Sequence, residues 1–286
     1  MPAERWIVIS NCQTYGLAHS LQMLANDVSV EPVDMGQYQA HIAHYNAAFG
    51  EIDRLLLGLG AEALPGADFA LARKIDKVPE LAFTAYHPDL AYIVHGETIV
   101  NGPIGSYHSL IAFVGYQTGR SVSDTLQLFN AQTYAACGYF DRWEWSRRDL
   151  ISYCDYLGYN IADAFTRWGR HSAFMYSSNH PRIDVLHDIA RIYLEREGYT
   201  PQVSALLPHD NLVSSGVFAV YPEIGEALGV PGSYLFKRIN AYSQIGLEQF
   251  VTESFAVYDG FAPGSLAVHD LSREAYTHLF SMLGGE

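Results

Sequence analysis

The first forty residues alternate between apolar runs and short polar turns. The apolar run Trp6-Ile7-Val8-Ile9 gives way to the polar residues Asn11-Cys12-Gln13, and leucines then recur at positions 17, 21 and 24. A short continuous apolar run is typical of a buried strand, and apolar positions three or four residues apart are typical of one helix face. We therefore expect a strand, a tight turn and a helix, followed by a second strand over residues 28–33.

Farther along the chain, the pattern predicts more helices than strands. Helical spacing over residues 37–64 ends at Pro65-Gly66, and the apolar residues 81–86 predict a strand that ends at His87-Pro88-Asp89. The helices expected after residue 120 begin at Ser121 and Ser146, follow Pro181 and Pro222, and occupy 245–257 and 272–283. Because no Gly-, Ser- or Pro-rich linker divides the chain, we expect one domain over residues 1–286. Its α/β core would extend to about residue 120 and its helical part would cover about 121–286.

Composition and charge restrict the class of protein. Of the 286 residues, 49% are hydrophobic and 17% are charged, which is typical of an ordered globular chain. The net charge of −14 disfavours a nucleic-acid or anionic-membrane partner. No apolar stretch has the length of a membrane span, and no secretory signal is recognisable. Three cysteines without C-x-x-C spacing indicate reduced thiols and argue against structural zinc, so we expect a cytoplasmic protein with no metal.

The polar turn at residues 11–13 is the first candidate for chemistry. In an open α/β sheet, ligands lie at the carboxyl ends of strands, where the N–H groups of the next helix attract negative charge. Cys12 stands at that point, and a helix N-terminus favours the nucleophilic thiolate. Asn11 and Gln13 offer amide groups to a developing oxyanion. The alternative is that Cys12 is a small buried hydrophobic residue in the turn.

Two later turns carry histidines suited to proton transfer near neutral pH. In His87-Pro88-Asp89 the proline fixes the backbone between an imidazole and a carboxylate, so His87 is a candidate base. His180, in Asn179-His180-Pro181, is a second candidate base or an anchor for a ligand. Both turns have structural alternatives, because Asp89 can cap the segment that follows it and His180 can cap the helix after Pro181.

An anionic ligand would need a local basic or glycine-bearing site. The loop over residues 101–109 contains glycines that let backbone N–H groups approach a phosphate. It lacks the P-loop and G-x-G-x-x-G patterns, which disfavours a nucleotide triphosphatase or a Rossmann dehydrogenase. The lysines are Lys74, Lys77 and Lys237, and Lys237 is followed by Arg238. The alternative for Lys237-Arg238 is a solvated pair on the surface.

Short motifs in a fixed order give the chain a resemblance to the WcbI family of capsular polysaccharide biosynthesis. The motifs are Ser10-Asn11-Cys12-Gln13, His87-Pro88-Asp89-Leu90, Gly102-Pro103, Tyr107-His108-Ser109, Phe129-Asn130, Asn179-His180-Pro181, Val220-Tyr221-Pro222-Glu223-Ile224 and Leu235-Phe236-Lys237. Together they cover nearly the whole chain. The resemblance implies an α/β fold with a small, mainly parallel sheet, N-terminal turns like those of SGNH esterases and Rossmann folds, and a large helical complement.

The resemblance also implies a cytoplasmic enzyme that takes coenzyme A, as acetyl-CoA, for its substrate and moves the acetyl group to a sugar hydroxyl. The catalytic residues it implies are Cys12 as acyl acceptor or carbonyl-facing group, His87 oriented by Asp89 as the base, His180 as the rival base, and Asn11 and Gln13 at the oxyanion. The cofactor-binding residues it implies are Lys237, Arg238, Tyr107, His108, Gly102 and Lys74.

Several alternatives stay open at the level of the sequence. The sugar hydroxyl could attack acetyl-CoA directly, with Cys12 only shaping the pocket. An esterase or thioesterase would use the same residues with water as the acceptor, and turnover without a sugar would reveal it. A non-catalytic module that binds coenzyme A or a nucleotide sugar would tolerate the loss of Cys12 and His87. A homo-oligomer is compatible with each of these alternatives.

Overall fold

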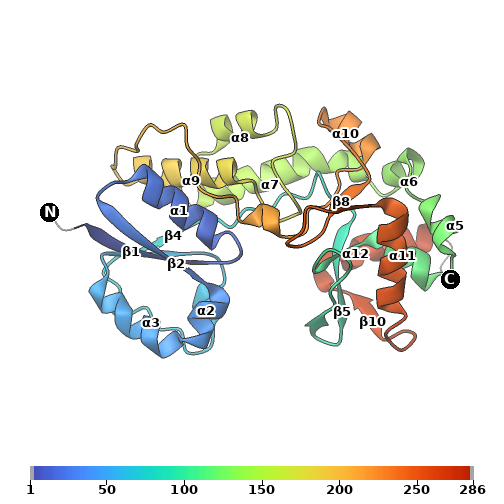
Figure 1. Cartoon of the computed structure of the whole chain (residues 1–286), viewed down its shortest axis with the longest axis horizontal. Coiled ribbons are helices and arrows are strands. Elements are labelled where there is room, and N and C mark those ends of the chain that lie inside the picture. Colours follow the sequence, from blue (N-terminus) through green and yellow to red (C-terminus); the bar gives the residue numbers. More distant parts are fainter. Residues whose placement is uncertain (1–2, 284–286) are drawn as a thin grey trace. The chain divides into compact units, whose positions relative to one another are not determined.

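The computed structural model describes residues 3–283, which form two compact units whose segments alternate along the chain (Figure 1). The first unit comprises Met1–Ala82, Arg148–Gly169 and Asn179–Leu212. The second unit comprises Phe83–Arg147, Arg170–Ser178 and Val213–Glu286. The expected domain boundaries at residues 1 and 286 lie outside the described residues, and the single domain stays a prediction.

A four-stranded parallel sheet forms the centre of the first unit. Its strands are β1 (Glu4–Ser10), β2 (Val28–Asp34), β3 (Arg54–Leu57) and β4 (Ile75–Lys77), in the order β2-β1-β3-β4. The side chains of residues 6–10 are buried, because β1 has a neighbouring strand on each side and helices on both faces of the sheet. The predicted α/β fold with a small parallel sheet is therefore confirmed.

Helices cover both faces of this sheet (Figure 1). One face carries α1 (Thr14–Leu24) and α9 (Ile183–Arg196), and the other carries α2 (Met35–Ala40) and α3 (Ile42–Ala48). Helices α1 and α9 pack closely, since a Cβ atom on Gly16 would lie 2.5 Å from Leu186 Cδ1. Any larger residue at position 16 would therefore force the Leu186 side chain to shift.

The strand order places the Asn11-Cys12-Gln13 turn at the topological switch point of the sheet. Strands β2 and β3 follow β1 in sequence but lie on opposite sides of it, so the chain reverses its direction of winding at β1. Open α/β sheets bind ligands at such a switch point, outside the carboxyl ends of the strands. Here the ends of β1 and β3 meet where Gly58 N donates to Ile9 O at 2.7 Å.

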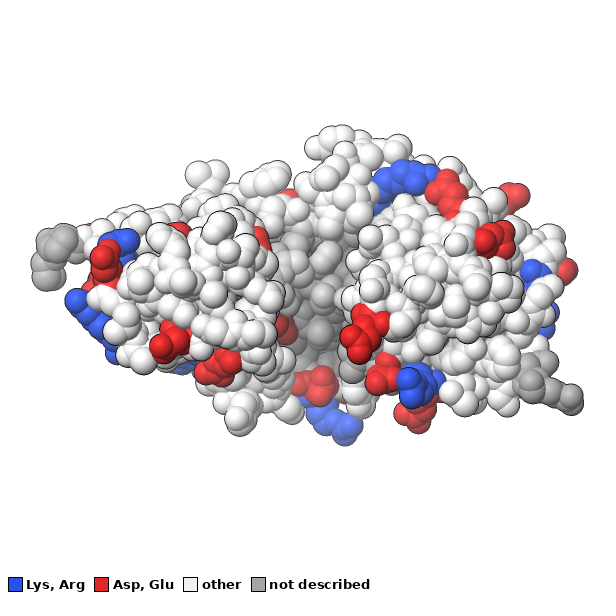
Figure 2. Space-filling model, turned by 90° about the horizontal axis from the view of Figure 1, so that it is seen from below, with Lys and Arg blue, Asp and Glu red and all other residues white. Residues whose placement is uncertain are grey.

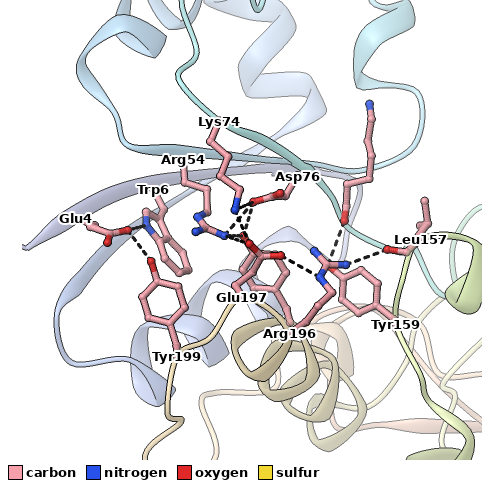
Figure 3. Close-up of polar contacts among 12 residues, drawn as sticks. Glu4, Trp6, Arg54, Lys74, Asp76, Leu157, Tyr159, Arg196, Glu197 and Tyr199 are labelled. Atoms are coloured by element: carbon pink, nitrogen blue, oxygen red, sulfur yellow. Dashed lines mark hydrogen bonds and ion pairs between the residues drawn. The ribbon is translucent and has the colours of Figure 1, made fainter.

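A buried charged cluster lies near the amino ends of β1 and β3, away from the Cys12 turn at their carboxyl ends (Figure 3). The Arg54 guanidinium donates to Asp76 Oδ2 at 3.0 Å and to Glu197 Oε2 at 2.8 Å, and it lies 5.0 Å from the Trp6 ring centroid. Tyr193 Oη accepts a further hydrogen bond at 2.7 Å. The cluster therefore joins β1, β3 and β4 to α9.

The second unit contains small antiparallel sheets and most of the remaining helices. Strand β5 (Leu90–His95) pairs with β6 (Thr98–Ile99), β7 (Tyr107–Ser109) and β10 (Leu266–Val268), and β8 (Leu235–Lys237) pairs with β9 (Gln244–Gly246). Its helices are α4 (Leu110–Gln117), α5 (Val122–Leu126), α6 (Ala131–Ala136), α10 (Pro222–Leu228), α11 (Leu247–Tyr258) and α12 (Arg273–Met282). Helix α7 (Arg142–Tyr156) begins in this unit and ends in the first, which also contains α8 (Ala162–Trp168).

Short 3₁₀ turns complete the fold, at Phe49–Glu51, Ala61–Ala63, Tyr139–Asp141, Leu212–Ser214 and Asp270–Ser272. The helices expected at Ser121, after Pro181 and after Pro222 are confirmed, and so are those near 245–257 and 272–283, whose ends differ by one or two residues. The helix expected to begin at Ser146 begins instead at Arg142. Ser146 lies inside it, with its hydroxyl 3.1 Å from Thr84 Oγ1.

Two predictions about local structure were wrong. The expected helical segment 37–64 contains α2, α3 and strand β3, because Leu55-Leu56-Leu57 is buried on both faces and such a run has no diagnostic period. The expected strand 81–86 is irregular, and Phe83 N donates to Ser178 O at 2.7 Å instead of joining a ladder. Aromatic contacts, not sheet pairing, bury that segment.

Candidate functional site

The turn after β1 is held in one conformation by its own polar groups. Asn11 Oδ1 accepts from Gln13 N at 2.9 Å, and Asn11 O accepts from Thr14 N at 3.1 Å and from Thr14 Oγ1 at 2.7 Å. Asparagine favours this arrangement because its short side chain can bond the backbone two residues on. Cys12 therefore sits at a fixed, partly exposed position before α1.

Gln13 holds distant segments together. Its Nε2 donates to Leu81 O at 2.8 Å and to Asn179 O at 3.0 Å, and its Oε1 accepts from Leu81 N at 3.0 Å. Both amide hydrogens are thus used in a side chain that is 2% exposed. Gln13 positions the turn, and its amide has no hydrogen left for an oxyanion.

Glu80 is a site residue that sequence reasoning missed. Its Oε1 accepts from Ser10 Oγ at 2.7 Å and from Asn11 N at 3.0 Å, directly behind Cys12. Gly58 leaves room for this carboxylate, since a Cβ there would lie 2.3 Å from Glu80 Oε1. No motif surrounds Glu80 in the sequence, so nothing in the local pattern distinguishes it from a solvated surface acid.

The electrostatics of the turn differ from the sequence expectation for Cys12. Burial, followed by the nearby Glu80 carboxylate, raises the pKa of the Cys12 thiol to about 11. The expected effect of the helix N-terminus was the opposite, stabilisation of the thiolate. At pH 7 the Cys12 thiol therefore keeps its proton.

His180 belongs to the first unit, as does Cys12. It directly follows Asn179, whose carbonyl accepts a hydrogen bond from Gln13 Nε2, so the Gln13 side chain joins the two polar turns. The side chain is half-buried, and burial lowers the pKa of its imidazole. A neutral imidazole is the form that can accept a proton.

His87 and Asp89 lie in the second unit, and Asp89 has other partners than the imidazole. The Asp89 carboxylate accepts from Tyr139 Oη at 2.9 Å, Tyr221 Oη at 2.6 Å and Ile111 N at 3.0 Å, and burial raises its pKa to about 6. His87 pairs instead through Nε2 with Phe218 O at 3.1 Å.

The His87 imidazole is enclosed by protein. It is 3% exposed, and burial lowers its pKa to about 4. Nδ1 is buried and has no hydrogen-bond partner within the described part of the chain. His87 is therefore neutral at pH 7, with an unpaired lone pair on Nδ1 that solvent does not reach in this conformation.

Of the three expected cationic residues, two are already paired. Arg238 binds Glu253 through two hydrogen bonds of 2.6 and 2.8 Å, and Lys74 contacts Glu197 in the cluster of Figure 3. Lys237 Nζ donates to Ser215 O at 3.3 Å and to Arg238 O at 3.1 Å, and it forms no ion pair within residues 3–283.

Lys237 faces an open pocket in the second unit. The pocket has a volume of about 170 Å³ and is lined by Val213, Ser214, Lys237, Asn240, Ala241 and Tyr242. Asn240 adopts a left-handed backbone conformation with φ +49°, which is uncommon outside glycine. A lysine among polar groups, without a carboxylate partner, is suited to an anionic ligand.

The glycine-bearing loop supplies mainly packing. His108 is fully buried, with Nε2 2.9 Å from Val100 O and Nδ1 3.1 Å from Tyr258 Oη. Tyr107 stacks on Tyr92 with ring centroids 4.4 Å apart. Gly102 N donates to Gly105 O at 2.7 Å and closes the loop. His108 therefore fixes the loop from inside and does not face a ligand in this conformation.

Charge is spread over the visible surface. On the face shown in Figure 2, Lys and Arg lie in small groups beside Asp and Glu, and uncharged residues cover most of the area. Among residues 3–283 no three His, Cys, Asp or Glu side chains are grouped as metal ligands would be. None of the helices in that range combines the length and the apolar character that crossing a membrane requires.

Comparison with known proteins identifies the family. Residues 5–202 match the family described as polysaccharide biosynthesis enzyme WcbI. The chain belongs to the WcbI family. The match includes the Asn11-Cys12-Gln13 turn, His87, Asp89 and His180, whereas Lys237 and its pocket lie beyond it. The resemblance inferred from the motifs is therefore confirmed.

A solved WcbI structure has the same fold as this member of the family. The two superpose with a TM-score of 0.66 at 15% sequence identity, covering 98% of this chain and 94% of the other. That protein is described as WcbI, a novel polysaccharide biosynthesis enzyme, in its native form without a disulfide bond between coenzyme A and one of its cysteines. Among curated proteins, none matches the chain.

Proposed function

We propose that this WcbI-family enzyme transfers an acyl group, acetyl in the first instance, from coenzyme A to a sugar hydroxyl in capsular or exopolysaccharide biosynthesis. The observation that carries the proposal is the Asn11-Cys12-Gln13 turn, which holds Cys12 at the switch point of the parallel sheet. The description of a WcbI structure in terms of coenzyme A and a cysteine supports a role for Cys12 near the thiol of the cofactor. Acetyl-CoA is a cytoplasmic metabolite, so the reaction would take place in the cytoplasm.

The raised pKa of Cys12 favours direct transfer over a covalent acyl-enzyme. A nucleophilic cysteine needs its thiolate, and the neighbouring Glu80 together with burial opposes that form. In the direct route the sugar hydroxyl attacks the thioester carbonyl, and the Cys12 thiol faces the carbonyl or the sulfur of the leaving group. The backbone N–H of Asn11 already donates to Glu80, so a developing oxyanion would have to be stabilised by other hydrogen-bond donors of the turn.

The proton of the attacking hydroxyl needs an acceptor, and we assign that role to His180 in preference to His87. His180 is half-buried and follows the carbonyl that binds Gln13, whereas His87 is enclosed and has a pKa of about 4. A base with a pKa so far below neutrality contributes little driving force for proton transfer. His87 and Asp89 then act as a polar core of the second unit.

In the second unit, Lys237 is the cation best suited to a phosphate of coenzyme A. It lines a polar pocket and forms no ion pair with another described residue. Arg238 and Lys74 already bind carboxylates and are weaker candidates. Calorimetric titration of the purified protein with coenzyme A tests this role, with Lys237→Gln as the variant and Arg273→Gln, which replaces an exposed cation of the same unit outside the pocket, as the control. Equal affinities in both variants would exclude Lys237.

The reaction itself is tested by following acetyl-CoA chromatographically with and without sugar acceptors. We expect release of coenzyme A only when an acceptor is present, strong loss of turnover in His180→Gln, and turnover within a few-fold of the original in Cys12→Ser. Intact-protein mass spectrometry should show no acetylated enzyme without acceptor. Release of coenzyme A without sugar would instead indicate a thioesterase. An acetyl group on Cys12 would refute direct transfer, and absence of coenzyme A binding would refute the proposal as a whole.

A further inference from the structure

A pocket in the first unit has no role in the chemistry described so far. It lies at the carboxyl ends of β3 and β4 and has a volume of about 250 Å³. The loop after β3 supplies Gly58 and Leu59, and the last turn of α7 supplies Tyr153 and Tyr156. Specific small-molecule sites begin at roughly 300 Å³, so the space suits one ring rather than a whole nucleotide.

The pocket adjoins the Cys12 turn through Glu80. Gly58 forms part of its wall, and a Cβ on Gly58 would lie 2.3 Å from Glu80 Oε1, the same oxygen that accepts from Ser10 and Asn11. Tyr153 Oη, on the other side, accepts from Glu80 N at 3.3 Å. Residues of the pocket wall and of the turn therefore contact the same carboxylate residue, and the pocket lies at the carboxyl ends of the strands, where ligands of open α/β sheets bind.

The lining combines an exposed aromatic surface with hydrogen-bonding groups. The Tyr156 side chain is 86% exposed and Leu59 is 69% exposed, although both are large apolar groups. Tyr153 and Tyr156 lie three residues apart and so on neighbouring positions of one helix face. Lys77 and Glu62 line the same pocket and form an ion pair with each other.

The charges favour a neutral ligand. Because Glu62 balances Lys77, the pocket offers no net positive charge to a phosphate. The Lys77 ammonium group still has hydrogens to donate to a ligand, and the Glu62 carboxylate still has lone pairs to accept hydrogen bonds from it. A pyranose ring fits both properties: its axial C–H face is apolar and packs on aromatic rings, while its hydroxyls both donate and accept hydrogen bonds.

We propose that this pocket binds the pyranose ring of the sugar acceptor, with the ring packed against Tyr156 and its hydroxyls bonded to Lys77 and Glu62. The inference rests on the proposed function for the identity of the ligand, and it adds the site at which that ligand is held. Tyr156 is then a specificity-determining residue. A ring held there lies beside Glu80 and the turn that carries Cys12.

Binding of simple pyranosides to the full chain tests the proposal without the cofactor. Saturation-transfer NMR is recorded with the methyl α-pyranosides of glucose, galactose and mannose, for the original protein and three variants. Tyr156→Ala removes the aromatic ring, Tyr156→Phe retains it, and Leu71→Ala removes another exposed apolar side chain of the first unit outside the pocket. Because Tyr156 is exposed, its replacement leaves the fold intact, which circular dichroism verifies.

We expect at least one pyranoside to bind, with affinity reduced roughly three- to tenfold in Tyr156→Ala and unchanged in Tyr156→Phe and Leu71→Ala. Lack of binding by all three sugars, or equal binding in Tyr156→Ala, would overturn the proposal. Displacement of the sugar by adenosine would also overturn it, because the pocket would then fit the base of the cofactor. Calorimetry with coenzyme A separates the two proposals, since loss of sugar binding with intact cofactor binding contradicts the pocket alone.

Discussion

Replacing Glu80 with glutamine removes a negative charge beside Cys12 while leaving an oxygen that can accept from Ser10 and Asn11. Burial is the largest cause of the raised Cys12 pKa and the Glu80 charge is the second. Removing a like charge at this range lowers a pKa by about one unit, so the Cys12 pKa should fall from about 11 to about 10. At pH 8 the thiolate fraction then rises about tenfold, and because nucleophilicity falls with pKa, the alkylation rate rises about threefold.

The assay is alkylation by iodoacetamide across a pH series, with each cysteine followed by peptide mass spectrometry. Cys137 and Cys154 serve as internal references, since burial and other groups than Glu80 raise their pKa values. Their rates should be equal in Glu80→Gln and the original protein. An unchanged or higher titration midpoint for Cys12, in a variant with native circular dichroism, would refute the electrostatic account of the turn.

Three further predictions concern stability. Gly58→Ala should lower the free energy of unfolding by about 1–3 kcal/mol in urea because its Cβ meets the Glu80 carboxylate, whereas Gly50→Ala, with 3.8 Å to its nearest neighbour, should cost less. Burial raises the pKa of Glu197, but its Lys74 and arginine partners lower it to about 2; Glu197→Gln should therefore cost about 3 kcal/mol near pH 7, a difference that disappears as the pH falls toward 2. Burial raises the pKa of Asp89 from 3.8 to about 6, so its protonation stabilises the fold below pH 4 and this contribution is lost as the pH rises through 6. Relative to Asp89→Asn, the free energy of unfolding of the original protein should fall by about 3 kcal/mol between pH 4 and pH 7. A constant difference between the two proteins would contradict the raised pKa of Asp89.

The parts of the fold encoded by neighbouring residues were predictable. The apolar run before residue 10, the turn and the leucine spacing define β1 and α1 by themselves, and Pro181 and Pro222 mark real helix starts. Strand β3 was not predictable, because a run of three leucines suits a buried helix as well as a buried strand. Strand β5 and its partners in the second unit depend on pairing with β10, from the far end of the chain, which no local pattern reports.

The candidate site shows the same division. The sequence indicated Cys12 as a site residue, but its pKa is raised by burial and by Glu80, which comes just after β4 and accepts a hydrogen bond from Asn11 N. Likewise, His87 and Asp89 are neighbours in sequence, yet the carboxylate binds Tyr139 and Tyr221 from distant segments. Residue type predicts which groups can take part in chemistry, whereas long-range packing sets the pKa, and therefore the protonation state, of each group.

The alternation of the two units along the chain has a consequence for synthesis and folding. The polypeptide passes from one unit to the other five times. Helix α1 ends at residue 24, whereas α9, the helix that packs on it, begins only at residue 183. The face of α1 that meets α9, at Gly16, therefore stays without its native cover until most of the chain has left the ribosome. Because the segments of the two units alternate, no single break in the chain, or in the gene that encodes it, separates one unit from the other.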